Sequence, residues 1–272
     1  MSLTEEFLKK CNQEELKSFT KLGANQKIAI NSISLFQKFE ENIQEEHTFL
    51  DVLKAFENIS NKSGILNFKR KPHPGSINNC MGRWFELIFF KYFDLLLSEK
   101  SIKGSLKEIG KLPSATDSKK FIDLFIEEQK KILKEINPAT SNPDFIVLDR
   151  IDNSIFDNDI EWIQKFQSTS FFGKVDIHKI VGIMSIKTSA RPDRRYQQLY
   201  EANLVKAIAL RFGKTIKFIS ITLHENEKNE EVYYSPSIVS IVQGGELKPS
   251  VDKSIVVEKI SDVKIVYDLL FN

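Results

Sequence analysis

The sequence predicts an α/β fold in which helices flank a mixed central sheet, with an N-terminal helical segment before it. Three short apolar runs bounded by turn residues, 144–148, 179–187 and 216–223, have the length and composition of buried strands. A helix is expected from about Pro192 to Arg211, between the second and third runs. The order strand, strand, helix, strand indicates a mixed sheet.

The segment before this core is expected to be helical over residues 1–62, because apolar residues recur at spacings compatible with a helix and turn residues follow at 61–64. An exposed basic loop with two prolines is predicted over 68–76. This loop marks the expected boundary between an N-terminal helical domain, residues 1–75, and a catalytic domain, residues 76–272.

The remaining elements are predicted from the apolar pattern alone. They are a long buried helix over 81–98, a loop over 101–118, an amphipathic helix over 119–136, a turn-rich connector over 137–143, and two further strands over 232–242 and 263–270.

Composition excludes several classes of protein. The chain has 272 residues, 41% hydrophobic and 28% charged, as in an ordinary globular protein, and no apolar run approaches the ~20 residues of a membrane span. Its two cysteines form neither a disulfide framework nor a zinc-ligand set. The N-terminus is polar and lacks a signal-peptide apolar region, so a cytoplasmic location is expected. The net charge of +2 means that any nucleic-acid-binding charge must be local.

Three polar residues stand at the ends of neighbouring predicted strands. Asp144 opens the first core strand, and Ser185 and Lys187 close the second. Because side chains two apart in a strand face the same way, Ser185 and Lys187 share a face and can meet Asp144 at one edge of the sheet. Metal-assisted phosphodiester hydrolysis needs these side chains close together. A carboxylate holds Mg²⁺, and a lysine orients water and offsets the charge that develops on the phosphate oxygens.

A second carboxylate is expected from the helix that follows. Along this helix a polar face carries Arg194, Gln197, Gln198 and Glu201, and the opposite face is predicted to be buried. The predicted buried face consists of Tyr196, Tyr200, Leu204, Ala207 and Ile208. Packing of the helix on the sheet could bring Glu201 to Asp144.

Pro143-Asp144, the Ser185-x-Lys187 pair and the displaced Glu201 resemble the PD-(D/E)XK nuclease pattern. More specifically, they resemble the CCGG-recognising family of type II restriction endonucleases, in which the second acid lies on the following helix. The string from Lys187 to Glu201 matches that family's Lys-x3-Arg-x-Asp-Arg-x6-Glu motif in every signature position. The resemblance covers about residues 143–203.

The resemblance implies a Mg²⁺-dependent, site-specific deoxyribonuclease with a restriction-endonuclease-like fold. It would cleave double-stranded palindromic DNA with a CCGG core and leave 5′-phosphates. It implies Asp144 and Glu201 as metal ligands, Lys187 as a catalytic residue and, from an upstream helix, Glu86 as a further acid. The long interval between Asp144 and Lys187 implies an insertion around 151–178.

Arg191, Asp193 and Arg194 crowd the first turn of the predicted helix, where the positive end of the helix dipole disfavours arginine. An anionic ligand rich in acceptors would relieve this, and DNA is one. Arginine can donate bidentately to guanine and aspartate can accept from cytosine N4 in the major groove. The resemblance implies Arg191 and Arg194 on the guanines and Asp193 on the cytosines. A palindrome implies a homodimer or a higher oligomer.

Each candidate residue also has a purely structural interpretation. Asp144 alone could cap a turn, and Lys187 and Glu201 alone could be solvated surface residues. Lys69, Arg70 and Lys71 are candidates for DNA contact, but they fit a solvated loop better. Ser185 is a further candidate for DNA binding. The alternatives in function are a catalytically silent, sequence-specific DNA-binding protein and a repair or mobile-element nuclease of the same superfamily.

Overall fold

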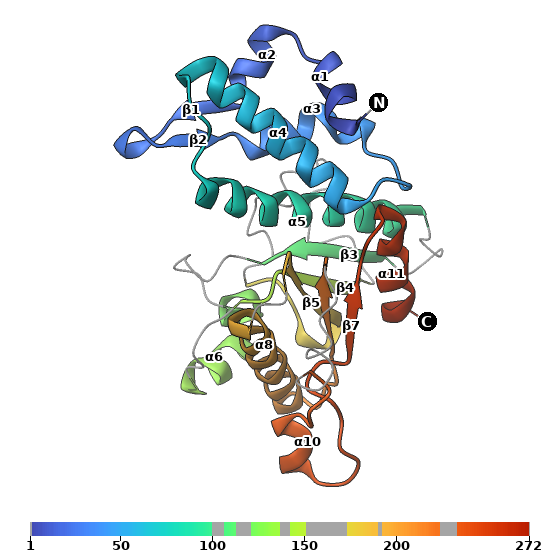
Figure 1. Ribbon diagram of the computed structural model, residues 1–272. Coiled ribbons are helices and arrows are strands. Elements are labelled where there is room, and N and C mark those ends of the chain that lie inside the picture. Colours follow the sequence, from blue (N-terminus) through green and yellow to red (C-terminus); the bar gives the residue numbers. More distant parts are fainter. Residues whose placement is uncertain are drawn as a thin grey trace. The chain divides into compact units, whose positions relative to one another are not determined.

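The computed structural model describes residues 2–99, 106–112, 121–136, 142–150, 173–189, 192–223 and 233–271 (Figure 1). The chain divides into two compact units, one formed by residues 1–92 with 257–263 and the other by residues 93–256 with 264–272. The first unit thus reaches Tyr92, whereas the boundary expected from the sequence lies at residue 75. Among the described residues, no helix combines the length and the sustained apolar character needed to cross a membrane.

The first unit is mainly helical. Its elements are α1 (Leu3–Lys9), α2 (Gln13–Ser18), β1 (Thr20–Leu22), η1 (Ala24–Gln26), β2 (Ile28–Ile30), α3 (Ser32–Phe39), η2 (Glu40–Asn42), α4 (Phe49–Phe68), most of α5 (Pro74–Glu99) and η5 (Ile260–Asp262). Ser2 with Glu5 and Asn12 with Glu15 form capping boxes that satisfy the first N–H groups of α1 and α2. At the start of α4 the side chain of Thr48 accepts from the N–H of Asp51, without the reciprocal bond of a capping box.

Aromatic side chains fill the core of this unit. Phe7 stacks on Phe39 with ring centroids 4.5 Å apart, and Phe56 meets Trp84 edge to face at 5.3 Å. The indole N–H of Trp84 donates to the carbonyl of Ser32 at 3.0 Å, so its one polar group is satisfied inside the core. The high phenylalanine content therefore serves packing.

Two expectations for this unit were wrong. Residues 20–30, expected to be helical, form an antiparallel hairpin of β1 and β2, in which Thr20 pairs with Ile30. The turn residues at 61–64 do not end the helix, because α4 continues to Phe68. Gly64 instead permits a close approach: a Cβ atom there would lie 2.8 Å from Cδ of Pro72. The basic loop does connect α4 to α5, and α5 begins at a proline, as helices often do.

The second unit is built on a five-stranded mixed sheet with the order β3-β4-β5-β6-β7. The strands are β3 (Leu106–Lys111), β4 (Phe145–Arg150), β5 (Ile180–Lys187), β6 (Lys217–Thr222) and β7 (Lys253–Val256). β3, β4 and β5 pair antiparallel, whereas β5, β6 and β7 pair parallel. The α/β fold with a mixed sheet is confirmed, and the three strands predicted for the core are its three central strands.

The helices of this unit are α6 (Glu127–Ile136), α8 (Pro192–Arg211), α10 (Ile238–Gln243) and α11 (Val263–Phe271), with the short turns η3 (Phe121–Leu124) and η4 (Ile177–Lys179). The prediction of α8 is confirmed at both ends. The two further strands predicted over 232–242 and 263–270 were wrong, because these segments form α10 and α11. In α11 the buried residues Val263, Val266, Tyr267 and Leu270 follow helical spacing, and Ser237 caps α10.

Both edge strands of the sheet were missed. β3 lies in a segment predicted as a loop, and it contains Lys107, Glu108 and Lys111. β7 has only four residues. Short and charged edge strands are common because they discourage pairing with other chains, and for the same reason they lack the apolar signal of a central strand.

The faces of the sheet are covered differently. Ile183 of β5 and Phe218 of β6 belong to one buried cluster with Ala202 and Val205 of α8, which runs beside the sheet (Figure 1). Gly182 points to the other face, where a Cβ atom would lie 2.3 Å from Leu270 of α11. Because side chains alternate along β5, Ser185 and Lys187 share the α8 face with Ile183. This alternation directs the polar end of β5 toward α8.

Candidate active site

The carboxylate of Asp144 is surrounded by donors from two neighbouring strands. Its Oδ2 atom accepts from the N–H of Ile186 at 2.6 Å and from Nζ of Lys187 at 2.7 Å, and it lies 3.4 Å from Oγ of Ser185. Its Oδ1 atom lies 3.5 Å from Nζ of Lys111, at the end of β3. The register of β4 against β5 produces this arrangement, since the N–H of Asp144 donates to the carbonyl of Met184.

These contacts keep Asp144 ionised. Burial by itself would raise the pKa of its carboxyl group, but the ammonium groups of Lys187 and Lys111 and the N–H of Ile186 outweigh burial and hold the pKa below its ordinary value. Asp144 is therefore a carboxylate at neutral pH, as a ligand for a divalent cation must be.

The lowered pKa of Asp144 predicts how its contribution to stability depends on pH. A carboxyl group with a lowered pKa stabilises the fold above its unfolded pKa of about 4, and this contribution is lost as pH falls through the folded value. We expect Asp144→Asn to lower the free energy of unfolding at pH 6, and by less at pH 3. Urea unfolding at both pH values measures the difference, and a difference that grows toward pH 3 would contradict the assignment.

Glu201 lies on α8 and is completely buried, at 0% exposure. Its Oε2 atom lies 3.1 Å from Oγ of Ser185, and its Oε1 atom accepts from Nε2 of Gln197 at 2.9 Å. Asp144 and Glu201 therefore approach the same serine hydroxyl, which carries one proton and can donate to one of them at a time. Ser185, one of the DNA-contact candidates, is itself fully buried, and its hydroxyl faces the two carboxylates.

The faces of α8 differ from the prediction. Tyr196 and Tyr200 were expected to be buried, but they are 64% and 43% exposed. Gln198 and Glu201, expected on a polar face, point inward together with Arg195. Polarity failed as a guide to orientation because this helix covers a polar part of the sheet, where buried carboxylate and amide groups find partners.

The segment proposed to contact base edges stands at the start of α8. Asp193 is exposed in the first helical turn, where the helix dipole favours an acid, and Arg194 is half-buried. Arg191 lies outside the described residues, as does the expected insertion up to residue 172.

The other candidates belong to the first unit. Lys69, Arg70 and Lys71 are exposed after the end of α4, and Arg70 donates to the carbonyl of Gln26. Glu86 is half-buried on α5. Glu86 and Asp144 belong to different units, and a catalytic role for Glu86 stays a proposal.

The residues at this site suit Mg²⁺. Asp144 and Glu201 supply oxygen donors only, and both lie within 3.4 Å of one hydroxyl oxygen. Within the described ranges, no three acidic, histidine or cysteine side chains gather into a metal-binding cluster. Mg²⁺ is commonly held by one or two carboxylates, with water and substrate phosphate oxygens completing its shell. A pair of carboxylates is therefore sufficient.

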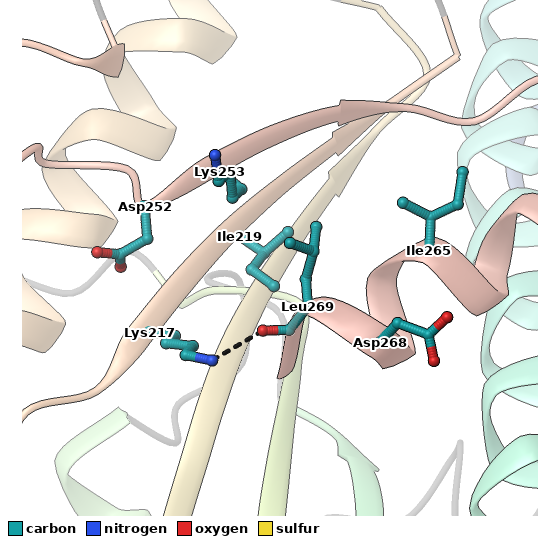
Figure 2. A pocket seen from close by; sticks show the side chains of 7 residues that line it. All are labelled: Lys217, Ile219, Asp252, Lys253, Ile265, Asp268 and Leu269. Atoms are coloured by element: carbon teal, nitrogen blue, oxygen red, sulfur yellow. Dashed lines mark hydrogen bonds between the residues drawn. The ribbon is translucent and has the colours of Figure 1, made fainter. Parts of the chain in front are cut away.

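A separate hollow lies elsewhere in the second unit. It has a volume of about 650 Å³ and is lined by residues of β6, of β7 and the residue before it, and of α11 (Figure 2). Lys217 donates there to the carbonyl of Leu269 at 2.8 Å, which satisfies the C-terminal end of α11. None of the residues predicted for the active site lines this hollow.

Three residues at or next to the carboxylate pair were not predicted from the sequence. Lys111 belongs to a strand that was predicted as a loop, so no local signal marked it. Gln198 was assigned to a polar helix face without a function, although it is buried and donates to the carbonyl of Ser185 at 3.2 Å. Tyr233 donates to Gln198, and it lies in a segment that was predicted as a strand.

The sequence of this chain is similar to those of known proteins. A family model described as Cfr10I/Bse634I restriction endonuclease matches residues 14–270. The chain is 30% identical over 212 residues to the type II restriction enzyme Cfr10I of Citrobacter freundii. The matched region covers 70% of this chain and 73% of that enzyme.

Solved structures show the same fold. The type IIF restriction endonuclease Bse634I, crystallised with cognate DNA, superposes with a TM-score of 0.77 over 94% of this chain and 99% of its own, at 18% identity. A second Bse634I structure gives a TM-score of 0.76, also at 18% identity, over 93% of this chain and 96% of its own.

Proposed function

The chain belongs to the Cfr10I/Bse634I restriction endonuclease family, and from this premise we propose that it cuts double-stranded DNA within a short palindrome that has a CCGG core. The family makes the protein a restriction endonuclease, a hydrolase that cleaves DNA at specific sites. The observation that carries the proposed chemistry is that the carboxylates of Asp144 and Glu201 approach one hydroxyl, that of Ser185, while Lys187 donates to Asp144.

In this proposal Asp144 and Glu201 would supply the carboxylate oxygens that hold Mg²⁺. When bound, Mg²⁺ would supply a water of lowered pKa and would polarise the scissile phosphate. The N–H of Ile186 and the hydroxyl of Ser185 keep the two carboxylates in place. Glu86 is retained as a proposed further acid.

Lys187 has three N–H donors, and one of them is directed to Asp144 at 2.7 Å. This ammonium group is suited to orient the attacking water and to donate to a non-bridging phosphate oxygen, where negative charge develops. Water forms the new bond to phosphorus and the bond from phosphorus to O3′ breaks. The products are a 5′-phosphate and a 3′-hydroxyl.

Sequence would be read by the segment that leads from Lys187 into the first turn of α8. Arg191 and Arg194 would donate to guanine O6 and N7, and Asp193 would accept from cytosine N4. Such residues recognise adjacent G·C pairs. A palindrome of these pairs is read most simply by two copies related by a two-fold axis, so we propose a homodimer at least.

The test is digestion of phage DNA by purified protein with Mg²⁺, followed by sequencing of the ends. We expect discrete fragments with uniform 5′ ends inside sites that contain CCGG. Fragments cut at another sequence would overturn the CCGG core, and a smear would favour a nuclease of the repair or mobile-element kind. Binding without cleavage in either Mg²⁺ or Mn²⁺ would favour a silent DNA-binding protein.

Arg194→Ala is expected to lower discrimination against a substituted guanine by ~1–3 kcal/mol, because a bidentate base contact is lost. Competition binding with CCGG and substituted duplexes measures this. Arg211→Ala, at the far end of the same helix, is the control and should leave discrimination unchanged. An equal loss of affinity for specific and random DNA would mark Arg194 as a phosphate contact instead.

A further inference from the structure

Two buried side chains form a chain of hydrogen bonds near Glu201: Gln198 joins α8 to β5, and Tyr233, from the segment before α10, binds Gln198. Nε2 of Gln198 donates to the carbonyl of Ser185 at 3.2 Å, and the hydroxyl of Tyr233 donates to Oε1 of Gln198. Gln198 is 1% exposed and Tyr233 is 0% exposed. These contacts lie away from solvent, on the side of α8 that faces the sheet.

Only one orientation of the Gln198 amide satisfies both partners. The carbonyl of Ser185 can only accept, so the amide nitrogen must face it. The amide oxygen then faces Tyr233, whose hydroxyl must donate. Burial raises the pKa of Tyr233 above its ordinary value, so the hydroxyl keeps its proton well above neutral pH. The pair therefore has a single defined geometry.

This geometry fixes the place at which Glu201 meets the sheet. Gln198 precedes Glu201 by three residues, so the two side chains lie on one face of α8, one turn apart. Gln198 binds the carbonyl of Ser185, and Glu201 approaches the hydroxyl of the same serine. A shift of α8 along β5 would break both contacts. A buried amide is costly unless its hydrogen bonds are made, so this network resists such a shift.

We propose that Gln198 and Tyr233 are positioning residues that hold α8 on β5 so that Glu201 and Asp144 form one divalent-cation site. The inference rests on the proposed function. Neither residue need touch the ion or DNA. Their effect passes through Ser185 and Glu201, and it should be seen first in metal affinity.

The experiment titrates Mn²⁺ into the purified protein, with free ion measured by electron paramagnetic resonance, and compares Gln198→Met and Tyr233→Phe with the unsubstituted protein. Gln198→Met should weaken Mn²⁺ binding by about tenfold or more, the usual effect of removing a residue that orients a metal ligand. Tyr233→Phe should weaken it in the same direction by less, because only one donor is lost. The Mg²⁺ concentration for half-maximal cleavage should rise in parallel, while affinity for DNA without metal stays unchanged.

Gln129 provides a matched control in the same unit. It is also buried, and it makes two hydrogen bonds of the same kind, donating to Asp176 at 2.7 Å and accepting from the N–H of Ile177 at 3.0 Å. Gln129→Met should therefore lower thermal stability about as much as Gln198→Met but leave Mn²⁺ binding unchanged. Equal weakening of Mn²⁺ binding by both variants would reduce Gln198 to a structural residue and overturn the inference.

Glu201→Gln separates this inference from the proposed function. If Glu201→Gln loses Mn²⁺ binding while Gln198→Met and Tyr233→Phe keep it, the positioning role is wrong and the proposed function stands. If Glu201→Gln binds Mn²⁺ as tightly as the unsubstituted protein, the proposed metal site fails and the inference fails with it. Should Gln198→Met not fold, Tyr233→Phe decides alone, because it removes a single oxygen atom.

Discussion

Lys187→Ala is expected to abolish DNA cleavage and to leave most DNA binding intact. Its ammonium group is the donor proposed to offset charge on the reacting phosphate, and loss of one such donor typically costs ~10²–10³ in rate. Loss of the water-orienting contact adds to this. Single-turnover cleavage measures the effect, and a mobility-shift assay without metal measures binding.

Lys206 is the natural control for this prediction. It lies on α8, pairs with Asp252 at 2.9 Å, and its side chain is 10% exposed, compared with 12% for Lys187. Lys206→Ala removes a comparable ion pair outside the site and should cleave DNA at close to the full rate. Full-rate cleavage by Lys187→Ala would refute the mechanism proposed for this site.

Asp144→Asn is expected to lower the cleavage rate by about three orders of magnitude, equivalent to about 4 kcal/mol in the activation free energy. The amide cannot supply the charged oxygen ligand that Mg²⁺ requires. DNA binding without metal should be equal or tighter, because a negative charge next to the phosphate is removed. Lys187 and Lys111 would also be released from their shared carboxylate.

Asp252→Asn is the matched variant. Asp252 accepts from Nζ of Lys206 at 2.9 Å and from the N–H of Phe218 at 2.7 Å, a lysine and a backbone N–H as at Asp144. It should lose stability without losing cleavage. If Asp144→Asn cleaves DNA as fast as Asp252→Asn does, the carboxylate of Asp144 has no catalytic role.

Local patterns were sufficient for the centre of the second unit. The three central strands are continuous apolar runs because both of their faces are covered, and α8 begins at a proline. Such signals depend on residues that are close in sequence. They failed for β3 and β7, which exist because they pair with a neighbouring strand. They also failed for α10 and α11, because short apolar runs fit either a strand or a helix.

By itself the sequence determined which groups are available: two carboxylates, a lysine and a serine, spaced so that a strand pair and a following helix can bring them together. Only the tertiary structure decided that Glu201 faces inward, that Lys111 stands beside Asp144, and that Gln198 and Tyr233 hold α8 to the sheet. The reason is that burial of a polar side chain depends on partners distant in the chain, and those partners are defined only when the strands and α8 have packed.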